Sequence, residues 1–314
     1  KQTGADKLCL GGTISANAHG RGLKMKPIIN DVESFTLINY KGELIKCNRE
    51  INYKLFRLVI GGYGLFGVIY SITLRLVKRK RMQRVVRLIN IKELSNYFKK
   101  RIRDGFDYGD FQFAINNKDS RFMVDGIFST YKSVSMQTPI PPKQKVLSED
   151  DWKQLYLLAH VNKQEAYEKY AGHYLSSSGQ IYWSDTMQLS TYVNDYHHII
   201  DQLINAKYEG SEMITEIYVP RKKLEIFMKK ARSYLIKNNI EVIYGTIRLI
   251  EKDNESFLAW AKSNYACIIF NFHVHHTKEG ILKNSKAFRK LIDIGITLKG
   301  SYFLTYHKYA TKRQ

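Results

Sequence analysis

The sequence is poor in cysteine, proline and long apolar runs. Its three cysteines, Cys9, Cys47 and Cys267, are odd in number and scattered along 314 residues, which argues against a disulfide framework and a cysteine-based metal site. No segment approaches the roughly 18 consecutive apolar residues that mark a membrane-spanning helix. We therefore expect no membrane span and a reducing, cytoplasmic setting.

Acidic residues are also scarce. The chain has 29 aspartates and glutamates against 50 lysines and arginines, which gives a formal net charge of +21 at pH 7. Such a charge can indicate binding to nucleic acid or to an anionic membrane, but the lysines are dispersed and the densest basic run covers only residues 78–81. A solvated lysine-rich surface is the simpler interpretation, so we do not expect nucleic acid as a partner. The positive potential would favour an anionic substrate or cofactor.

Residues 62–67, Gly-Tyr-Gly-Leu-Phe-Gly, match the dinucleotide-binding pattern G-x-G-x-x-G. In a Rossmann unit this loop follows a strand and begins a helix whose N-terminus holds the pyrophosphate. Here the apolar residues of 53–60 have mainly helical spacing, and residues 70–76 alternate as a strand does. The reversed order argues against a Rossmann unit. A bare glycine backbone could instead lie against a flat or extended ligand.

A second run of small residues covers positions 11–22 and follows the short apolar run 8–10. Such a segment lets backbone N–H groups approach a polyanion closely. A predicted hairpin, with strands at 32–38 and 44–47, separates the two glycine runs. Glycines usually serve turns, so either run alone is weak evidence for a ligand site.

Taken together, residues 11–20, 31–37 and 55–69 resemble, in order and spacing, the FAD-linked oxidases of the vanillyl-alcohol-oxidase type, which have a PCMH-type FAD-binding domain. Alditol oxidase, L-gulonolactone oxidase and decaprenylphosphoryl-ribose oxidase are similar members. The resemblance is dense over residues 8–77 and thinner beyond them. It implies FAD as the cofactor.

The resemblance also implies an α+β fold in three parts. Residues 1–80 would form the C-terminal lobe of the FAD-binding domain, and residues 81–298 a substrate (cap) domain with a mainly antiparallel sheet flanked by helices. Residues 299–314 would form a tail strand that returns toward the flavin. Relatives carry a further N-terminal lobe with the main pyrophosphate loop, and the resemblance implies that residues 1–80 correspond only to the lobe that follows it. Without that lobe we expect four apolar side chains to be exposed: Leu8, Leu10, Ile14 and Val68.

Backbone contacts to the flavin are implied at the positions that match the family's two small-residue runs. These positions are Gly11, Gly12, Ala16, His19, Gly20, Gly64, Gly67 and Ile69. His19 would lie beside the flavin and could contact substrate. The alternative is that His19 only caps a helix.

The spacing of apolar residues predicts the elements of the second part. Strands are expected at 85–89, 111–115, 122–131, 213–219, 242–250 and 266–274, and helices at 93–103, 152–174 and 222–237. This order suggests a sheet with one face covered by helices and the other open to the chemistry.

Along residues 268–275, Asn271, His273 and His275 share one face of the predicted strand. Three interpretations stay open: a solvated sheet face, a substrate pocket facing the flavin, and a metal site. The metal site is disfavoured because no nearby cysteine or carboxylate completes a ligand set. We therefore predict no metal.

Further site residues follow from the resemblance. Residues 245–253 are similar to a strand of the family that begins with Glu-x-Arg: Arg248 matches the arginine, which contacts substrate or flavin, whereas Thr246 takes the place of the glutamate. The alternative for Arg248 is an ion pair on the strand face. Near the C-terminus, Tyr306 and His307 are the candidates for a donor beside the flavin, and a regular strand would point only one of them inward. His19, Arg248, His273, His275, Tyr306 and His307 thus form the predicted catalytic set.

The function implied is oxidation of a hydroxylated small molecule or sugar-type substrate by hydride transfer to flavin. The sequence does not distinguish an oxidase from a dehydrogenase. The main rival is a truncated, catalytically impaired remnant or split-enzyme subunit that needs a partner chain.

Overall fold

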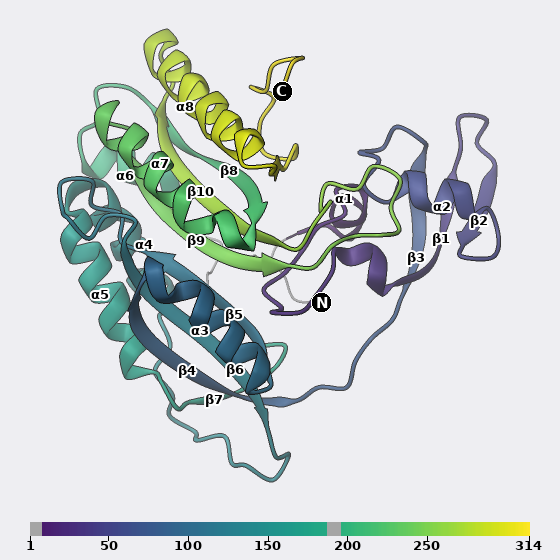
Figure 1. The fold of residues 1–314 in the computed structure, drawn as a ribbon, viewed down its shortest axis with the longest axis horizontal. Helices are drawn as coiled ribbons and strands as arrows, with labels where there is room; N and C mark the ends of the chain where they lie inside the picture. The colour runs from purple at the N-terminus through teal and green to yellow at the C-terminus, as the bar shows by residue number, and fades with distance from the viewer. Residues whose placement is uncertain (1–7, 187–195) are drawn as a thin grey trace.

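A computed structural model describes residues 8–186 and 196–314, and these residues form two antiparallel sheets. A three-stranded sheet has the order β2-β1-β3, and an eight-stranded sheet has the order β11-β8-β10-β9-β5-β6-β4-β7 (Figure 1). Helices flank the large sheet. The predicted α+β class with a mainly antiparallel sheet is confirmed.

The small sheet and its helices follow the local sequence pattern closely. Its strands are β1 (Val32–Ile38), β2 (Leu44–Asn48) and β3 (Val68–Leu74), and its helices are α1 (Leu10–Ser15), the 3₁₀ turn η1 (Ile28–Asp31) and α2 (Tyr53–Val59). Phe35 and Phe56 stack at 5.6 Å in its buried core. The order of helix, glycine loop and strand between α2 and β3 is as predicted from residues 53–76.

The large sheet takes its strands from most of the remaining chain. They are β4 (Arg81–Asn90), β5 (Phe106–Phe113), β6 (Asp125–Val134), β7 (Ile181–Trp183), β8 (Gly210–Pro220), β9 (Val242–Ile250), β10 (Tyr265–His275) and β11 (Ser301–Tyr302). β8 and β9 both pair along β10, with Ile269 opposite Glu216 on one side and Thr246 on the other. This register decides which side chains share a face.

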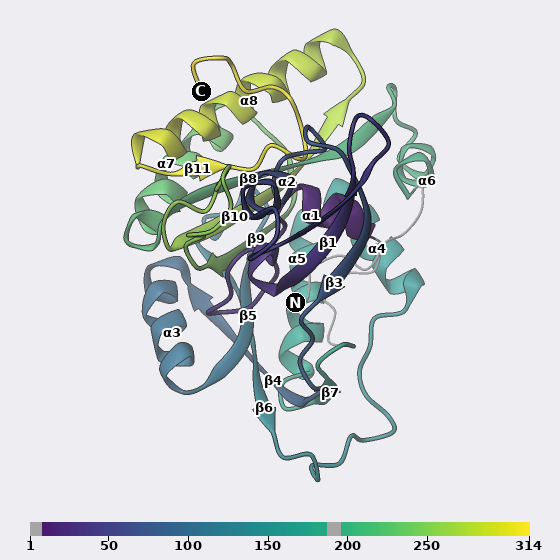
Figure 2. The same ribbon diagram turned by 90° about the vertical axis from the view of Figure 1, so that its right-hand side faces the viewer.

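Helices lie on both faces of the large sheet (Figures 1 and 2). One face carries α3 (Ile91–Arg103), α7 (Leu224–Lys237) and α8 (Lys278–Thr297), and the other carries α4 (Glu149–Val161) and α5 (Lys163–Ser176). The short helix α6 (Tyr196–Leu203) and the 3₁₀ turn η2 (Arg221–Lys223) complete the described elements. The expectation of one open face is therefore wrong, because Ala171 and Tyr174 of α5 pack on Val86 and Ile127 of the sheet.

Two predicted elements differ in extent. The expected helix at 152–174 is two helices, because Asn162 leaves the helical region with φ −147° and ψ 75° and its side chain caps α5 by accepting from the N–H of Glu165. The expected tail strand is only two residues long, β11, and the chain then continues without regular structure. Helix α8 was not anticipated at all.

An early segment of the chain fills a gap in the large sheet. β5 and β9 pair only at Phe111–Ile247 and Gln112–Thr246, and then separate. Residues 21–25 enter this gap: Leu23 donates its N–H to Asp107 O and Gly109 donates to Arg21 O, each at 2.9 Å, while Glu251 donates to Met25 O at 3.0 Å. The N-terminal segment therefore belongs physically to the large sheet as well as to the small one.

Asn17 fastens this early segment to the loop after β9. The side chain is fully buried at a positive φ of 49°, donates to Asp253 Oδ2 at 2.9 Å and accepts from the N–H of Ile29 at 3.1 Å. The backbone carbonyl oxygen of Asn17 accepts from the indole N–H of Trp260 at 3.1 Å. Farther along the same loop, Glu255 forms an ion pair with Arg49 at 2.7 Å, so the loop also reaches the small sheet.

The surface near α1 and β3 exposes apolar side chains. Leu8, Leu10 and Val68 are 54%, 47% and 68% exposed, in agreement with the expectation for these three residues. Ile14 contradicts it, because its side chain points into the core of the small sheet and is fully buried. No helix in the described part of the chain is long and apolar enough to cross a membrane.

Candidate active site

The face of the large sheet that carries α4 and α5 holds an unusual number of buried polar side chains. Strand alternation and register place Arg248 of β9, Cys267 of β10 and Glu216 of β8 together on this face. The segment after α1 covers them from outside with His19. All four side chains are buried.

Glu216 is the centre of the cluster. Its Oε2 accepts from the Tyr218 hydroxyl at 2.7 Å and lies 2.9 Å from Nε2 of His19, while its Oε1 accepts from the Tyr306 hydroxyl at 2.9 Å. The thiol of Cys267 lies 3.8 Å from both Glu216 and His19. Four distant segments of the chain thus meet at one carboxylate.

The electrostatics of the cluster favour an ionised carboxylate. Burial alone would raise the pKa of Glu216, but the positive charge of His19 and the hydrogen bonds from His19 and Tyr218 outweigh it and lower the pKa to about 2. Burial, together with the charge of Glu216, raises the pKa of the Tyr306 hydroxyl and of the Cys267 thiol well above their usual ranges. Tyr306 and Cys267 are therefore protonated at neutral pH.

His19 is held in one orientation by its surroundings. Its Nδ1 lies 3.2 Å from the carbonyl oxygen of Gly20, which can only accept a hydrogen bond, so Nδ1 carries a proton. Nε2 lies 2.9 Å from the Glu216 carboxylate, so both ring nitrogens face hydrogen-bond acceptors. The rings of Trp260, Tyr218 and Phe303 surround it at 5.5, 6.1 and 6.2 Å.

Arg248 extends the polar face toward β5. Its guanidinium is buried and its Nε has no hydrogen-bond partner. Asp110, also fully buried, accepts from Gln112 through Oδ2 at 2.5 Å, and its Oδ1 lies 3.9 Å from Nη1 of Arg21 in a buried ion pair. Burial raises the pKa of Asp110, although the charges of Arg21, Arg248 and Arg84 oppose that shift. A buried donor without a hydrogen-bond partner, such as Nε of Arg248, fits a site for a polar ligand.

The two small-residue runs lie against each other, as their combined resemblance required. Gly61 donates its N–H to Ile14 O at 3.2 Å, and Tyr63 donates to Ser15 O at 3.0 Å. The hydroxyl of Tyr63 lies 3.3 Å from that of Thr305. The glycine loop, α1 and the C-terminal tail therefore form one wall beside His19.

The glycines of this wall differ in what they accommodate. A Cβ on Gly11 or Gly64 would meet no atom within 4 Å, so both face open space, although Gly64 also has a positive φ of 80°. A Cβ on Gly67 would lie 2.5 Å from Ile38 O, and one on Gly12 would lie 2.8 Å from the sulfur of Cys9. Close packing within the protein thus explains why positions 12 and 67 are glycine. At Gly11 no protein atom is close, so there is room for a ligand.

The other predicted cofactor contacts are placed as follows. Ala16 is buried with Tyr218 and Trp260, Gly20 is buried beside His19, and Ile69 packs partly buried on the core of the small sheet. The side chain of Ile69 therefore points away from the wall.

The C-terminal tail places Tyr306 and His307, the two predicted donors, on opposite faces of the large sheet. Tyr306 reaches Glu216, but His307 lies on the opposite face of β8, where Nε2 is 3.1 Å from the hydroxyl of Thr215 and the ring stacks on Phe288 of α8 at 4.3 Å. The expectation that both residues lie on the side of Arg248 is wrong for His307. Adjacent residues face opposite ways, and α8 offers an apolar partner on the far side.

His273 and His275 share the face of Cys267 but not its cluster. His273 pairs with Glu212 at 3.2 Å, and Glu212 lies four residues before Glu216 on β8, about 13 Å away along the strand. His275 is exposed at the end of β10. The predicted catalytic set is thus divided: His19 and Tyr306 contact Glu216, Arg248 lies on the same face, and His273, His275 and His307 lie elsewhere.

Glu216 and Asp110 were not among the predicted site residues. Glu216 stands inside the apolar run 213–219, and a carboxylate at the middle of such a strand was the available signal. Its partner His19 lies 197 residues earlier, which no local pattern reveals.

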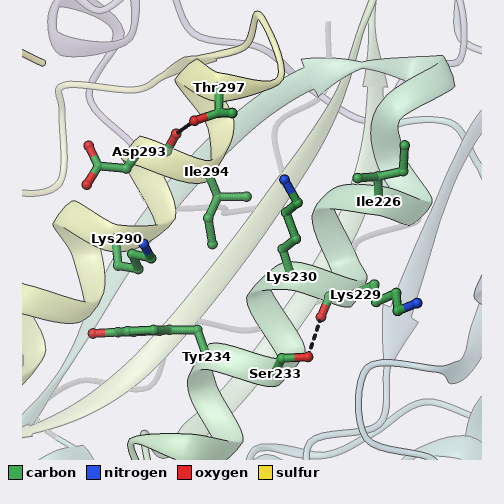
Figure 3. A pocket seen from close by; sticks show the side chains of 9 residues that line it. All are labelled: Ile226, Lys229, Lys230, Ser233, Tyr234, Lys290, Asp293, Ile294 and Thr297. Carbon is green, nitrogen blue, oxygen red and sulfur yellow. Dashed lines mark hydrogen bonds between the residues drawn. The ribbon is translucent and has the colours of Figure 1, made fainter.

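A surface hollow of about 690 Å³ lies away from this cluster, between α7 and α8 on the other face of the sheet (Figure 3). Lys229, Lys230 and Lys290 line it together with Tyr234 and Asp293. The hollow contains none of the buried polar groups described above and is not the candidate site.

Comparisons with known proteins agree with the motifs. No protein-family profile matches the chain. Cytokinin dehydrogenase 4 of Oryza sativa subsp. japonica is 25% identical over 268 residues, covering 79% of this chain and 48% of that protein. Mitochondrial L-galactono-1,4-lactone dehydrogenase of Arabidopsis thaliana is 33% identical over 91 residues, covering 29% of this chain and 15% of that protein. The chain thus spans about half the length, or less, of these relatives.

Among solved structures, a solvent-stable cholesterol oxidase matches with a TM-score of 0.65 over 96% of this chain and 64% of its own, at 15% identity. This likeness concerns the fold alone. The two dehydrogenases confirm the resemblance to FAD-linked oxidoreductases that the glycine runs indicated, and the oxidase agrees with it in fold.

Proposed function

We propose that the chain belongs to an FAD-dependent oxidoreductase that oxidises a hydroxylated small molecule or sugar-type substrate by hydride transfer. The observation that carries the proposal is the convergence of His19, Glu216 and Tyr306 on one buried face beside Arg248. In this proposal residues 1–80 bind the cofactor, residues 81–298 bind the substrate, and residues 299–314 return to the flavin and line the site.

The described residues fit a flavin. Gly11 and Gly64 leave open backbone on the wall, and Arg248 offers a buried Nε without a partner. Gly11, Gly64 and the backbone near His19 would hold the cofactor. When bound, the flavin supplies a hydride acceptor, and the protein supplies position and charge.

Each side chain of the cluster has a role that follows from its contacts. Glu216 is ionised and holds both the ring of His19 and the hydroxyl of Tyr306 in place. The Arg248 guanidinium can donate in a fork to substrate oxygens, which positions the carbon that loses hydride. Burial of the cluster excludes water and strengthens each of these interactions.

The substrate class is proposed only coarsely. The relatives are named for a cytokinin, a galactonolactone and, in the solved structure, cholesterol. The buried arginines and the net charge of +21 favour a substrate with oxygen atoms and negative charge. A cytoplasmic setting belongs to the same proposal and rests on the three free cysteines.

The rival is a subunit that needs a partner chain before it binds flavin. The exposed apolar side chains Leu8, Leu10, Leu65 and Val68 near the glycine wall support this alternative. Both proposals keep FAD as the cofactor and differ in whether this chain alone holds it.

Flavin retention tests the proposal. The chain is incubated with FAD, desalted, and its visible spectrum recorded, alone and after co-expression with the N-terminal lobe of a relative. Retention by the chain alone supports the self-sufficient enzyme, and retention only with the lobe supports the subunit. No retention in either case contradicts both.

Arg248→Gln provides the matched test of the site, with the exposed Arg103→Gln as its control. Flavin-linked oxidation that is equal in the two variants would remove Arg248 from the site.

A further inference from the structure

A second cluster of buried ionisable groups lies at the far end of the same sheet face. His160 comes from the last turn of α4, Glu212 from the start of β8 and His273 from the end of β10. Glu212 and His273 are directly opposite each other in the β8–β10 register. Their side chains are only 4%, 5% and 6% exposed for His160, Glu212 and His273.

The three side chains converge on one point. Nε2 of His160 lies 2.8 Å from Oε1 of Glu212, and Nδ1 of His273 lies 3.2 Å from the same oxygen. The three atoms, one from each residue, all lie within 4.8 Å of one another. The two imidazole rings are 4.9 Å apart and nearly perpendicular, so neither blocks the other's approach to the carboxylate.

The hydrogen bond on the other ring nitrogen of His160 orients its Nε2 toward Glu212. Its Nδ1 lies 2.7 Å from the backbone carbonyl of Tyr156, which can only accept, so Nδ1 carries the proton. A neutral ring would then turn the lone pair of Nε2 toward a carboxylate oxygen. A cation bound between Nε2 and Oε1 would be a partner for both atoms, which lie 2.8 Å apart.

Two features favour the cation. A histidine that binds a metal typically donates its other ring N–H to a backbone carbonyl or carboxylate, which is the bond that His160 makes to Tyr156. Gly210 lacks the Cβ that would lie 2.3 Å from Cε1 of His273, so the backbone leaves room for the ring to stand in this place.

We propose that His160, Glu212 and His273 bind a divalent transition-metal ion, zinc in the first instance, as a structural clamp between α4 and the sheet. Two imidazole nitrogens and one carboxylate oxygen are a ligand set of zinc, with a fourth position open to water. Zinc bonds of about 2.1 Å separate tetrahedral ligands by about 3.4 Å, so Nε2 and Oε1 must move apart by roughly 0.6 Å, which small side-chain rotations allow.

The sequence had disfavoured a metal here because no carboxylate stood near His273 in the chain. The carboxylate comes from the neighbouring strand, 61 residues away. The cluster lies about 13 Å along β8 from Glu216, so the ion would stabilise the fold and take no part in the oxidation.

The test uses the full chain, stripped with a chelator, dialysed against micromolar zinc and analysed for metal by mass spectrometry. Wild type should hold one zinc per chain and gain several degrees in melting temperature. His160→Gln and Glu212→Gln should each bind zinc at least tenfold more weakly and lose the gain, whereas His198→Gln, which changes an exposed histidine, should match wild type.

Three results would overturn the proposal. They are a wild type that retains no zinc, a Glu212→Gln variant that retains zinc at wild-type affinity, and loss of zinc in His198→Gln. Circular dichroism of each stripped variant separates loss of the ligand from loss of the fold, and His273→Gln replaces either variant that fails to fold.

Discussion

Tyr306 and Glu216 stand 90 residues apart in the chain and meet in a hydrogen bond of 2.9 Å from the tyrosine hydroxyl to Oε1 of the carboxylate. The bond brings the irregular C-terminal tail to the middle of β8. It also gives the carboxylate a donor on the side opposite His19 and Tyr218. The tail therefore completes the site, although it adds only two residues of regular strand to the sheet.

Replacing Glu216 with glutamine tests the importance of this carboxylate to the fold. The variant should lose about 3–5 kcal/mol in its free energy of unfolding, because the buried charge of His19 loses its partner. Urea denaturation followed by fluorescence measures the loss. Glu33→Gln, which removes an exposed ion pair with Arg75, should leave the unfolding midpoint unchanged. Equal midpoints for the two variants would contradict the central place of Glu216.

Removing the charge of Arg248 should affect catalysis more than folding. Arg248→Met is expected to lower kcat by about 10²–10³-fold in the flavin-loaded protein, as loss of one preorganised donor does in other enzymes. Steady-state oxidation of candidate alcohols measures the change, and melting temperature monitors the fold. An unchanged kcat would assign Arg248 to the alternative role of a strand-face ion pair.

Gly11 gives the cleanest test of backbone contact with the cofactor. Gly11→Val should abolish flavin retention without lowering the melting temperature, because an added Cβ meets no protein atom within 4 Å and φ there is ordinary. Gly172→Val, also on a helix and also facing open space, is the control and should retain flavin normally. By contrast, Gly67→Val should destabilise the fold, since its Cβ would collide with Ile38 O. Normal retention by Gly11→Val would place the cofactor elsewhere.

Asn17 should be among the most sensitive positions for stability. Asn17→Ala is expected to cost about 2–4 kcal/mol, because it leaves Asp253 and the N–H of Ile29 with fewer partners and puts alanine at a positive φ. Asn17→Gly relieves the backbone strain alone and should recover only part of the loss. Chemical denaturation of both variants separates the two contributions. A complete recovery by glycine would mean that the side-chain hydrogen bonds contribute little.

His307 should make stability depend on pH between about 6.5 and 4. Burial lowers its pKa from the usual 6.5 to about 4, so across this interval the unfolded chain binds more protons than the folded one. The stabilisation of the fold by the neutral His307 ring is complete above pH 6.5 and is lost as the pH falls through 4. His307→Gln should flatten this part of the stability profile, and the exposed His198→Gln should not. A steeper profile in His307→Gln would reverse the assigned sign.

The sequence predicts those elements whose conformation depends on residues close together in the chain. The glycine loop at 61–67, the hairpin of β1 and β2, and most strands of the large sheet follow from alternation, turn residues and the resemblance. The break at Asn162 was overlooked, because a single asparagine inside an apolar periodic stretch can end one helix and cap the next.

The site was predictable only in part, because strand pairing assembles it. His19, Tyr306 and Arg248 were recognisable from motifs, but their common partner Glu216 becomes a partner only through the β8–β10–β9 register. Strand pairing also explains why His273 and His19 lie in separate clusters. Alternation predicts which face of a strand a residue occupies, but not how far along the sheet its partners lie.

The gap between β5 and β9 has a consequence for how the protein reaches its native state. Residues 21–25, which fill the gap, leave the ribosome long before Asp107, Gly109 and Glu251, to which they are hydrogen-bonded. Residues 21–25 therefore lack their final hydrogen-bond partners until almost the whole sheet has been synthesised. Such distant pairing makes assembly slow and leaves the early segment accessible to chaperones or proteases during synthesis.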